Sequence, residues 1–472
     1  MGRTTEIDAE HAIKFAKDRE EFWRPQSLLD DKALALYRRK QRQDTAVGEV
    51  GAKVLPLRAG VAGMIIDNDT ATLGAPPTFK FTPSSDKYED EQKASGLLEP
   101  WMLGVFQQAQ VEDVWSQQIR DLRLFGRGYS NVFPLPRMWA GEGPYKELVL
   151  RLTKARQEDE IRALLAEIEA WKRDNFPIRW QYADSRTTWP LLSSEYLLPE
   201  IVEARVMTGA EIETDYDHEM DNPKMEYTVY VYTNWVWTVT CVEVGGQPVE
   251  LRKWKHNMGM SPYIIMEANV QPRNKENIRW KSALYDHENM FEAYDGILTD
   301  MYQASRENTV SGMVAYFDPR RNEGSGVVGL TNPAEHLDKE PGKTMSMWIG
   351  EDLRRQPLPE FTEVGMSLAQ FVNNFVMNVS LNPARLGLVT QGLSAVGHRL
   401  AMRAAERSLD PFSRALVSGA TTMAKLALRS VIRLSEEYPD APDKVYVTHD
   451  KHGHIGVGPK DIKGWESLVQ PI

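Results

Sequence analysis

The chain has 472 residues, of which 42% are hydrophobic and 26% charged, a balance typical of globular proteins. Its single cysteine, Cys241, excludes an internal disulfide and a metal site built from several cysteines. The formal net charge of −11 argues against a protein that grips DNA, because such affinity comes largely from cations that neutralise phosphates. No apolar stretch is long enough to predict a membrane span or a secretory signal, so we expect no membrane partner.

The N-terminal part is predicted to join helices to short extended segments. Residues 1–50 are highly charged and helical in character. A short helix and a strand are expected within residues 54–81, because Pro76 and Pro77 end the helix and favour an extended backbone after it.

Glycines mark the end of the next helical segment, residues 92–124. Gly126 and Gly128 break this helix, and the sequence YSNVF that follows is typical of a strand. Apolar residues then recur at helical spacing within residues 151–176, with charges on the other face. This pattern predicts an amphipathic surface helix.

Residues 177–270 are predicted to be rich in β-structure. The sequence MEYTVYVYTNWVWTVTCVEV is dense in Tyr, Thr, Val and Trp, which favour strands. Gly245 and Gly246 follow it and predict a tight hairpin turn. Cys241 lies within the strand pattern, so we expect it to be buried by packing.

Residues 282–305 form a helical pattern with an acidic polar side. The apolar positions cover a wide surface, which suits a helix that is packed on two sides. The polar positions hold carboxylates and neither lysine nor arginine: Asp286, Glu288, Glu292, Asp295 and Asp300. Taken alone, this segment is better explained as a core helix with a solvated acidic face.

The remainder of the second half alternates helices with an insert and a loop. Residues 309–361 predict a small mixed insert with strands around a Gly- and Pro-rich loop. Residues 362–380 predict a helix with a neutral amide face, and residues 381–397 a loop rich in glycine. A long helix over residues 398–438 should be kinked or broken at Pro411.

Three short motifs suggest other chemistry. GSGVVG at residues 324–329 matches a dinucleotide fingerprint, but no helix begins after it, which disfavours that site. Residues 215–226 place acids at calcium-loop spacing, although Met220 stands where the turn needs glycine. The histidines at 449–454 alternate in a hairpin pattern. The alternative function is a nucleic-acid-processing metalloenzyme that uses the acidic residues 215–226 or these histidines.

The order of these parts resembles the tailed-bacteriophage portal family, the head-to-tail connector with wing, stem, clip and tunnel loop. VAGMIIDNDTATLGAPP and LFGRGYSNVFPLP are similar to early segments of that family. SALYDHENMFEAYDGILTDMYQASREN resembles its first stem helix, and NPARLGLVTQGLSAVGHRLAMRAAER its tunnel loop and the helix after it. The resemblance covers most of residues 54–438.

The resemblance implies an α+β portal fold with a mixed wing, a two-helix stem, a small α/β clip and a long kinked tunnel helix. The implied boundaries are 1–279 for the wing (β-rich at 177–270), 280–308 and 362–380 for the stem helices, 309–361 for the clip, 381–397 for the tunnel loop, 398–440 for the long helix and 441–472 for a short strand-containing tail.

It also implies roles for particular residues. The channel-facing stem residues are Asp286, Glu292, Asp295 and Asp300. The residues near DNA in the tunnel loop and the adjoining helix are Asn382, Arg385, Gln391, Ser394 and Arg399. The clip residues that dock other proteins are Arg320, Arg321 and Glu323.

The implied function is structural, with no catalytic residue, metal or cofactor. The chain is expected to form a ring homo-oligomer, a dodecamer by the resemblance, at one capsid vertex of a virion that assembles in bacterial cytoplasm. Its expected partners are the terminase large subunit, the major capsid or scaffold protein, a head–tail connector or adaptor, and double-stranded DNA that passes without specific binding.

Overall fold

The computed structural model describes residues 7–38, 60–81, 89–110, 113–134, 148, 151–152, 154–174, 176–192, 200–271, 277–309, 313–316, 352–355, 367, 370, 374, 409–437, 444–449, 453–462 and 469–471. The contacts between residues divide the chain into two compact units. Unit 1 holds residues 1–34, 66–285 and 406–472, and unit 2 holds residues 35–65 and 286–405.

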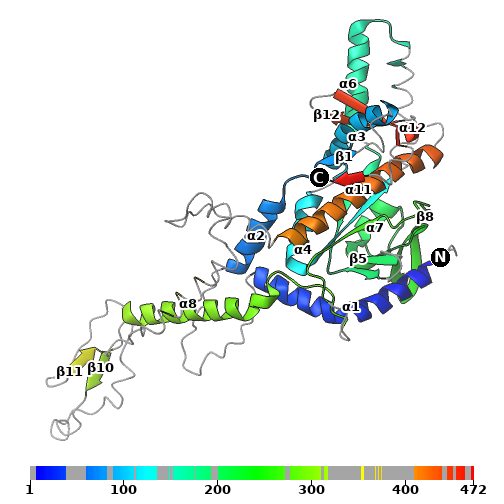
Figure 1. The fold of residues 1–472 in the computed structure, drawn as a ribbon. Helices are drawn as coiled ribbons and strands as arrows, with labels where there is room; N and C mark the ends of the chain where they lie inside the picture. Colours follow the sequence, from blue (N-terminus) through cyan, green and yellow to red (C-terminus); the bar gives the residue numbers. More distant parts are fainter. Residues whose placement is uncertain are drawn as a thin grey trace, which may run out of the picture. The chain divides into compact units, whose positions relative to one another are not determined.

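The fold is mixed α and β, with antiparallel sheets throughout the described residues (Figure 1). The helices are α1 (Ala9–Tyr37), α2 (Val61–Leu73), α3 (Glu89–Gln108), α4 (Val114–Phe125), α6 (Glu158–Asp174), α7 (Gly209–Tyr216), α8 (Glu288–Thr309), α11 (Asp410–Glu437) and α12 (Pro459–Ile462). The strands are β1 (Phe79–Phe81), β2 (Arg127–Pro134), β3 (Ile178–Ala183), β4 (Thr188–Leu191), β5 (Glu200–Thr208), β6 (Glu226–Thr233), β7 (Trp237–Val244), β8 (Gln247–Lys255), β9 (Tyr263–Glu267), β10 (Met313–Tyr316), β11 (Asp352–Arg355), β12 (Val445–His449), β13 (Gly453–Val457) and β14 (Val469–Pro471).

A five-stranded sheet in the order β4-β5-β6-β7-β8 confirms the predicted β-rich region. Gly245 and Gly246 adopt φ values of 58° and 82° in the β7–β8 turn, which the sequence predicted from their freedom to take positive φ. Helix α1 packs against one face of this sheet, where Phe15 contacts Tyr232 edge to face at 5.2 Å. Cys241 is buried on that face, as predicted, and burial raises the pKa of its thiol to about 12.

A three-stranded sheet in the order β3-β2-β9 lies at the centre of the larger core. Helix α11 packs along β2 and β9, and α4 also contacts β2 (Figure 1). By length and composition α11 resembles a membrane-spanning helix, but 61% of its apolar window is buried inside the protein. We therefore assign α11 to the core of unit 1.

A predicted helix differs from the structure at its boundaries. The segment predicted over 92–124 is two helices, because the chain leaves α3 so that Ala109 can accept a hydrogen bond from Trp180 of β3, and Asp113 then caps α4. The kink or break predicted at Pro411 involves residues 398–408, which lie outside the described part of the chain. Pro411 lies in the first turn of α11, where its missing N–H leaves no intrahelical hydrogen bond unmade.

Unit 2 contains α8 and a pair of short strands. Strands β10 and β11 pair antiparallel, with Met313 opposite Arg355. The expected strand TMSMWIG, residues 344–350, lies outside the described residues, and the strand that pairs with β10 is Asp352–Arg355. Ser367, Gln370 and Asn374 are helical and exposed, at positions within the predicted second stem helix.

The predicted tail contains a hairpin. Strands β12 and β13 pair antiparallel, and β14 pairs with β1. His449 and His454 lie on the two strands of this hairpin. The described residues contain no group of three or more His, Cys, Asp or Glu side chains arranged to hold a metal ion, at this hairpin or near residues 215–226.

Candidate functional site

The first part of the candidate site is an exposed stripe along α8. Asn289, Glu292, Ala293, Gly296 and Asp300 are all exposed, and their spacing of three or four residues places them on one side of the helix. The opposite side carries Phe291, which is 5% exposed. The sequence from residue 282 to 305 contains neither lysine nor arginine, so the carboxylates of this stripe have no lysine or arginine within one helical turn on α8.

The four predicted stem carboxylates divide into two environments. Asp286, Glu292 and Asp300 are exposed, and Asp286 belongs to the 3₁₀ turn that precedes α8. Asp295 is half-buried and lines a small recess of unit 2 with Leu36 and other residues near it. Asp295 therefore does not lie on the exposed stripe with Glu292 and Asp300.

The other predicted site residues lie outside the described part of the chain. These are the tunnel-loop group Asn382, Arg385, Gln391, Ser394 and Arg399, and the clip group Arg320, Arg321 and Glu323.

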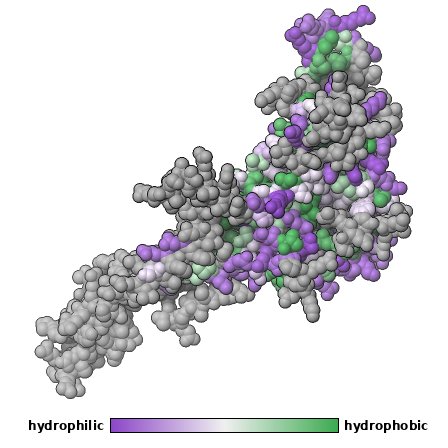
Figure 2. All heavy atoms as spheres, in the orientation of Figure 1, coloured by the Kyte–Doolittle hydropathy of each residue, from purple (hydrophilic) through white to green (hydrophobic). Residues whose placement is uncertain are grey.

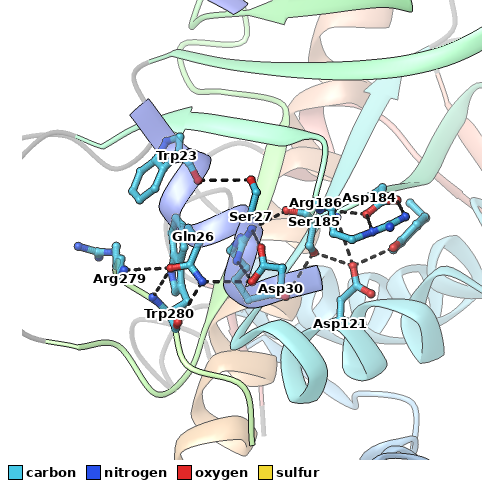
Figure 3. A network of polar contacts seen from close by, with 12 residues as sticks. Trp23, Gln26, Ser27, Asp30, Asp121, Asp184, Ser185, Arg186, Arg279 and Trp280 are labelled. Atoms are coloured by element: carbon cyan, nitrogen blue, oxygen red, sulfur yellow. Dashed lines mark hydrogen bonds and ion pairs between the residues drawn. The ribbon is translucent and has the colours of Figure 1, made fainter. Parts of the chain in front are cut away.

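The second part of the candidate site is a buried anchor for the residues that precede α8 (Figure 3). Gln26 of α1 is 1% exposed, and its amide holds the backbone at residues 279–280. Its Oε1 accepts hydrogen bonds from the N–H groups of Arg279 and Trp280, each at 3.0 Å, and its Nε2 donates to the Trp280 carbonyl at 3.1 Å. The Gln26 amide thus forms the backbone hydrogen bonds that a neighbouring strand would otherwise form with residues 279–280.

A buried ion pair lies next to this amide. Arg127 of β2 donates to both carboxylate oxygens of Asp30, at 3.2 and 2.6 Å, and both side chains are 3% exposed. Gln26 Nε2 also donates to Asp30, at 3.1 Å, and Arg127 donates to the Ser185 carbonyl at 2.7 Å. Burial alone would lower the pKa of Arg127, but the adjacent Asp30 raises it, so the guanidinium stays charged.

Trp280 joins the ion pair to the rest of the anchor. The Arg127 guanidinium lies over its ring at 4.5 Å, and Trp23 of α1 contacts the same ring at 4.8 Å. The indole N–H of Trp280 donates to Glu267 at 2.8 Å, and Arg279 pairs with both oxygens of that carboxylate. Residues 279–280 are therefore tied to α1, to β2 and to β9.

Gly126 allows the chain to pass close to this anchor. It has a φ of 74°, and a Cβ at this position would lie 2.5 Å from the Lys281 carbonyl oxygen. Ala283 donates its N–H to the carbonyl of Arg123 at 3.0 Å, and Arg123 lies in the last turn of α4, just before Gly126. These contacts explain why the helix predicted over 282–305 begins only at Glu288: the backbone of residues 280–283 is engaged elsewhere.

Asp121 of α4 extends the polar network (Figure 3). Its Oδ2 accepts hydrogen bonds from the hydroxyls of Tyr182 and Ser185, at 2.8 and 2.6 Å, and from the Ser185 N–H at 3.3 Å. Burial raises the pKa of Asp121 to about 7, against the opposing effect of the Ser185 hydroxyl. Ser185 therefore connects a titratable carboxyl to the Asp30–Arg127 pair.

Sequence reasoning identified the acidic helix but missed its anchor. Gln26 and Asp30 lie one helical turn apart among buried α1 residues such as Trp23 and Ala33. Polar residues on the buried face of an amphipathic helix are the signal that was available, because such groups require partners. The identity of those partners was not available from α1 alone.

Comparisons with known proteins give a likeness among solved structures. No protein-family model and no curated protein matches the chain. Among solved structures, the chain is similar to a protein of the neck of an empty GTA particle, at 12% identity and a TM-score of 0.33. This likeness covers 81% of the chain and 79% of the other protein.

Replacing Gly126 by alanine should destabilise unit 1 by about 2–4 kcal/mol, because the new methyl group meets the Lys281 carbonyl and the backbone has a positive φ. Urea unfolding followed by tryptophan fluorescence measures the change. Gly96→Ala in α3 is the control, since nothing lies within 4 Å of its Cβ position and it should leave stability unchanged or slightly higher. Equal midpoints for the two variants would contradict the close approach at Gly126.

Asp121 should make stability depend on pH in an unusual direction. Its pKa is raised to about 7 in the folded chain, while an unfolded aspartate titrates at about 3.9, so the folded state binds the proton more tightly. The contribution is complete below about pH 4 and is lost as the pH rises towards 7. As the pH rises between those values, Asp121→Asn should therefore lose less stability than the native chain.

Urea unfolding at several pH values tests this sign. Asp159→Asn is the matched control, because Asp159 is an exposed acid of α6. Identical pH slopes for the native chain and Asp121→Asn would show that the Asp121 carboxyl is not protonated in the folded state.

Proposed function

We propose that this chain is the portal subunit of a tailed bacteriophage or a related particle. Identical copies form a ring at one capsid vertex, and DNA passes through its central channel during packaging and ejection. The protein acts as a conduit and carries out no catalysis itself. The resemblance of residues 54–438 to the portal family motivates this proposal.

The observation that carries the proposal is the chain path through unit 2. Helix α8 ends at Thr309, and β10 begins at Met313. Strand β10 pairs antiparallel with β11, which comes later in the chain, and helical residues follow at 367, 370 and 374. A helix, an insert closed at its base by paired strands, and a second helix are the order that a stem and a clip require.

The exposed stripe of α8 supplies a suitable wall for a DNA channel. Carboxylates at Glu292 and Asp300 repel phosphates, and the helix offers no cation over residues 282–305 to which phosphate could bind. In a ring, each copy would add the same pair of charges. At physiological ionic strength repulsion acts within about 8 Å, so it reduces adhesion without closing a wide bore.

The anchor at residues 279–280 suits a part that bears load. DNA transport applies force to the stem, and the chain before α8 must keep its position in unit 1. The buried Asp30–Arg127 pair resists displacement, because separating one partner leaves an unpaired buried charge at a cost of about 3–5 kcal/mol.

The proposal assigns the remaining contacts by the family resemblance. Arg320, Arg321 and Glu323 of the clip dock the terminase large subunit first and then the connector proteins, and the wing meets the capsid or scaffold protein. The tunnel-loop group, Asn382, Arg385, Gln391, Ser394 and Arg399, lies near the passing DNA. The site of action is the virion, after assembly in the host cytoplasm.

Electron microscopy and native mass spectrometry of the purified chain test the assembly. We expect rings with a central hole and a single dominant subunit number. A chain that stays a monomer under every assembly condition, or that hydrolyses nucleic acid with added divalent metal, would overturn the proposal.

Charge reversal on the stripe tests the channel. The double variant Glu292→Lys, Asp300→Lys should still form rings, because both side chains are exposed, but should slow DNA packaging by about tenfold as lysines hold the phosphates. Asp159→Lys, at an exposed position of α6, is the control and should package normally. Normal packaging by the double variant would mean that the stripe does not face DNA.

A further inference from the structure

A recess of about 270 Å³ lies in unit 1, between strands of the two larger sheets. Strand β3 of the three-stranded sheet contributes Arg179 and Gln181, and β5 and β8 of the five-stranded sheet contribute Arg205 and Arg252. The remaining lining residues are Phe133, Pro134, Asp215, Tyr216, Val231, Thr238, Thr240 and Trp254. The proposed portal function makes no use of this recess.

The recess has more cationic than anionic side chains. Arg205 is already neutralised by Glu203, to which it donates at 2.6 and 2.9 Å. Arg179 is half-buried, and no described residue forms an ion pair or hydrogen bond with its guanidinium. Asp215 is the acidic residue of the lining, and it is exposed. A half-buried arginine without a carboxylate leaves several N–H donors unmatched.

Aromatic side chains form part of the wall of the recess. The Nε1 of Trp254 is shielded from solvent and has no hydrogen-bond partner. The ring of Trp254 is held between Phe133 at 6.1 Å and His256 at 5.7 Å, so the indole is fixed in place. Because the Nε1 atom is not exposed, a ligand in the recess contacts the ring of Trp254 and not its N–H group.

We infer that this recess binds a carboxylate side chain of an acidic peptide segment in a partner protein. A planar carboxylate matches the fork of a guanidinium, as the pairs of Arg205 with Glu203 and of Arg186 with Asp184 already show in this chain. The recess has room for one side chain and cannot enclose a DNA duplex. The aromatic wall at Phe133 and Trp254 packs against the aliphatic part of a glutamate.

Isothermal titration of the full chain with a short blocked peptide of alternating Glu and Gly tests the inference. We expect saturable binding that weakens with salt, and no binding of the matching Gln and Gly peptide. Arg179→Gln and Arg252→Gln should each weaken binding by about tenfold, the effect of losing one hydrogen bond to a charged group. Circular dichroism of each variant confirms that the fold is retained.

Arg162→Gln is the matched control, because Arg162 is an exposed arginine of α6 paired with Glu158 at 3.1 Å, away from the recess lining. It should bind the acidic peptide as the native chain does. The inference is overturned if the native chain binds neither peptide, if it binds both equally, or if Arg179→Gln has no effect. Tighter binding of inorganic phosphate or of a short single-stranded oligonucleotide at Arg179 would also overturn it, because the ligand of the recess would then be a phosphate and not a carboxylate.

Discussion

The buried pair of Asp30 and Arg127 is the constraint on which unit 1 depends. Both side chains are 3% exposed, so each charge is kept from water and requires the other. The surrounding groups complete the requirement: Gln26 bonds to the carboxylate, the Ser185 carbonyl accepts from the guanidinium, and the Trp280 ring covers it. These contacts join residues up to 254 positions apart in sequence, so they exist only when α1, β2 and residues 279–280 are assembled together.

The residues before α8 are held in place by buried contacts, whereas the exposed stripe of α8 is not. The backbone before this helix is fixed by Gln26 and by the approach of Lys281 to Gly126. The exposed stripe at Glu292 and Asp300 contributes little to packing, because its side chains lie in solvent in the isolated chain. Substitutions there act on surface charge more than on folding. The chain therefore places buried polar contacts before α8 and exposed carboxylates on the helix itself.

Local signals in the sequence predicted local structure well and distant pairings poorly. The paired glycines at 245–246 predicted a hairpin turn, and Gly126 marked the end of α4. Both signals are local, because glycine can adopt a positive φ wherever it stands in the sequence. The start of α8 was predicted too early, at residue 282, since Ala283 hydrogen-bonds to Arg123 and the preceding Trp280 hydrogen-bonds to Gln26. No periodicity encodes that competition. The acidic stripe was found from composition, while the inward rotation of Asp295 required the position of Leu36 and its neighbours.

Net charge describes this chain less well than the distribution of its charges. A total of −11 is compatible with solubility alone, and it does not distinguish a conduit from any other acidic protein. The structure separates two contrasting regions that the total conceals. Glu292 and Asp300 lie on a helix that has no lysine or arginine before residue 306, whereas Arg179 lines a recess with more arginines than carboxylates. The proposed portal function uses the first region to repel a polyanion, and the proposed peptide site uses the second to hold a single carboxylate, so the two proposals place opposite charges in separate regions of one acidic chain.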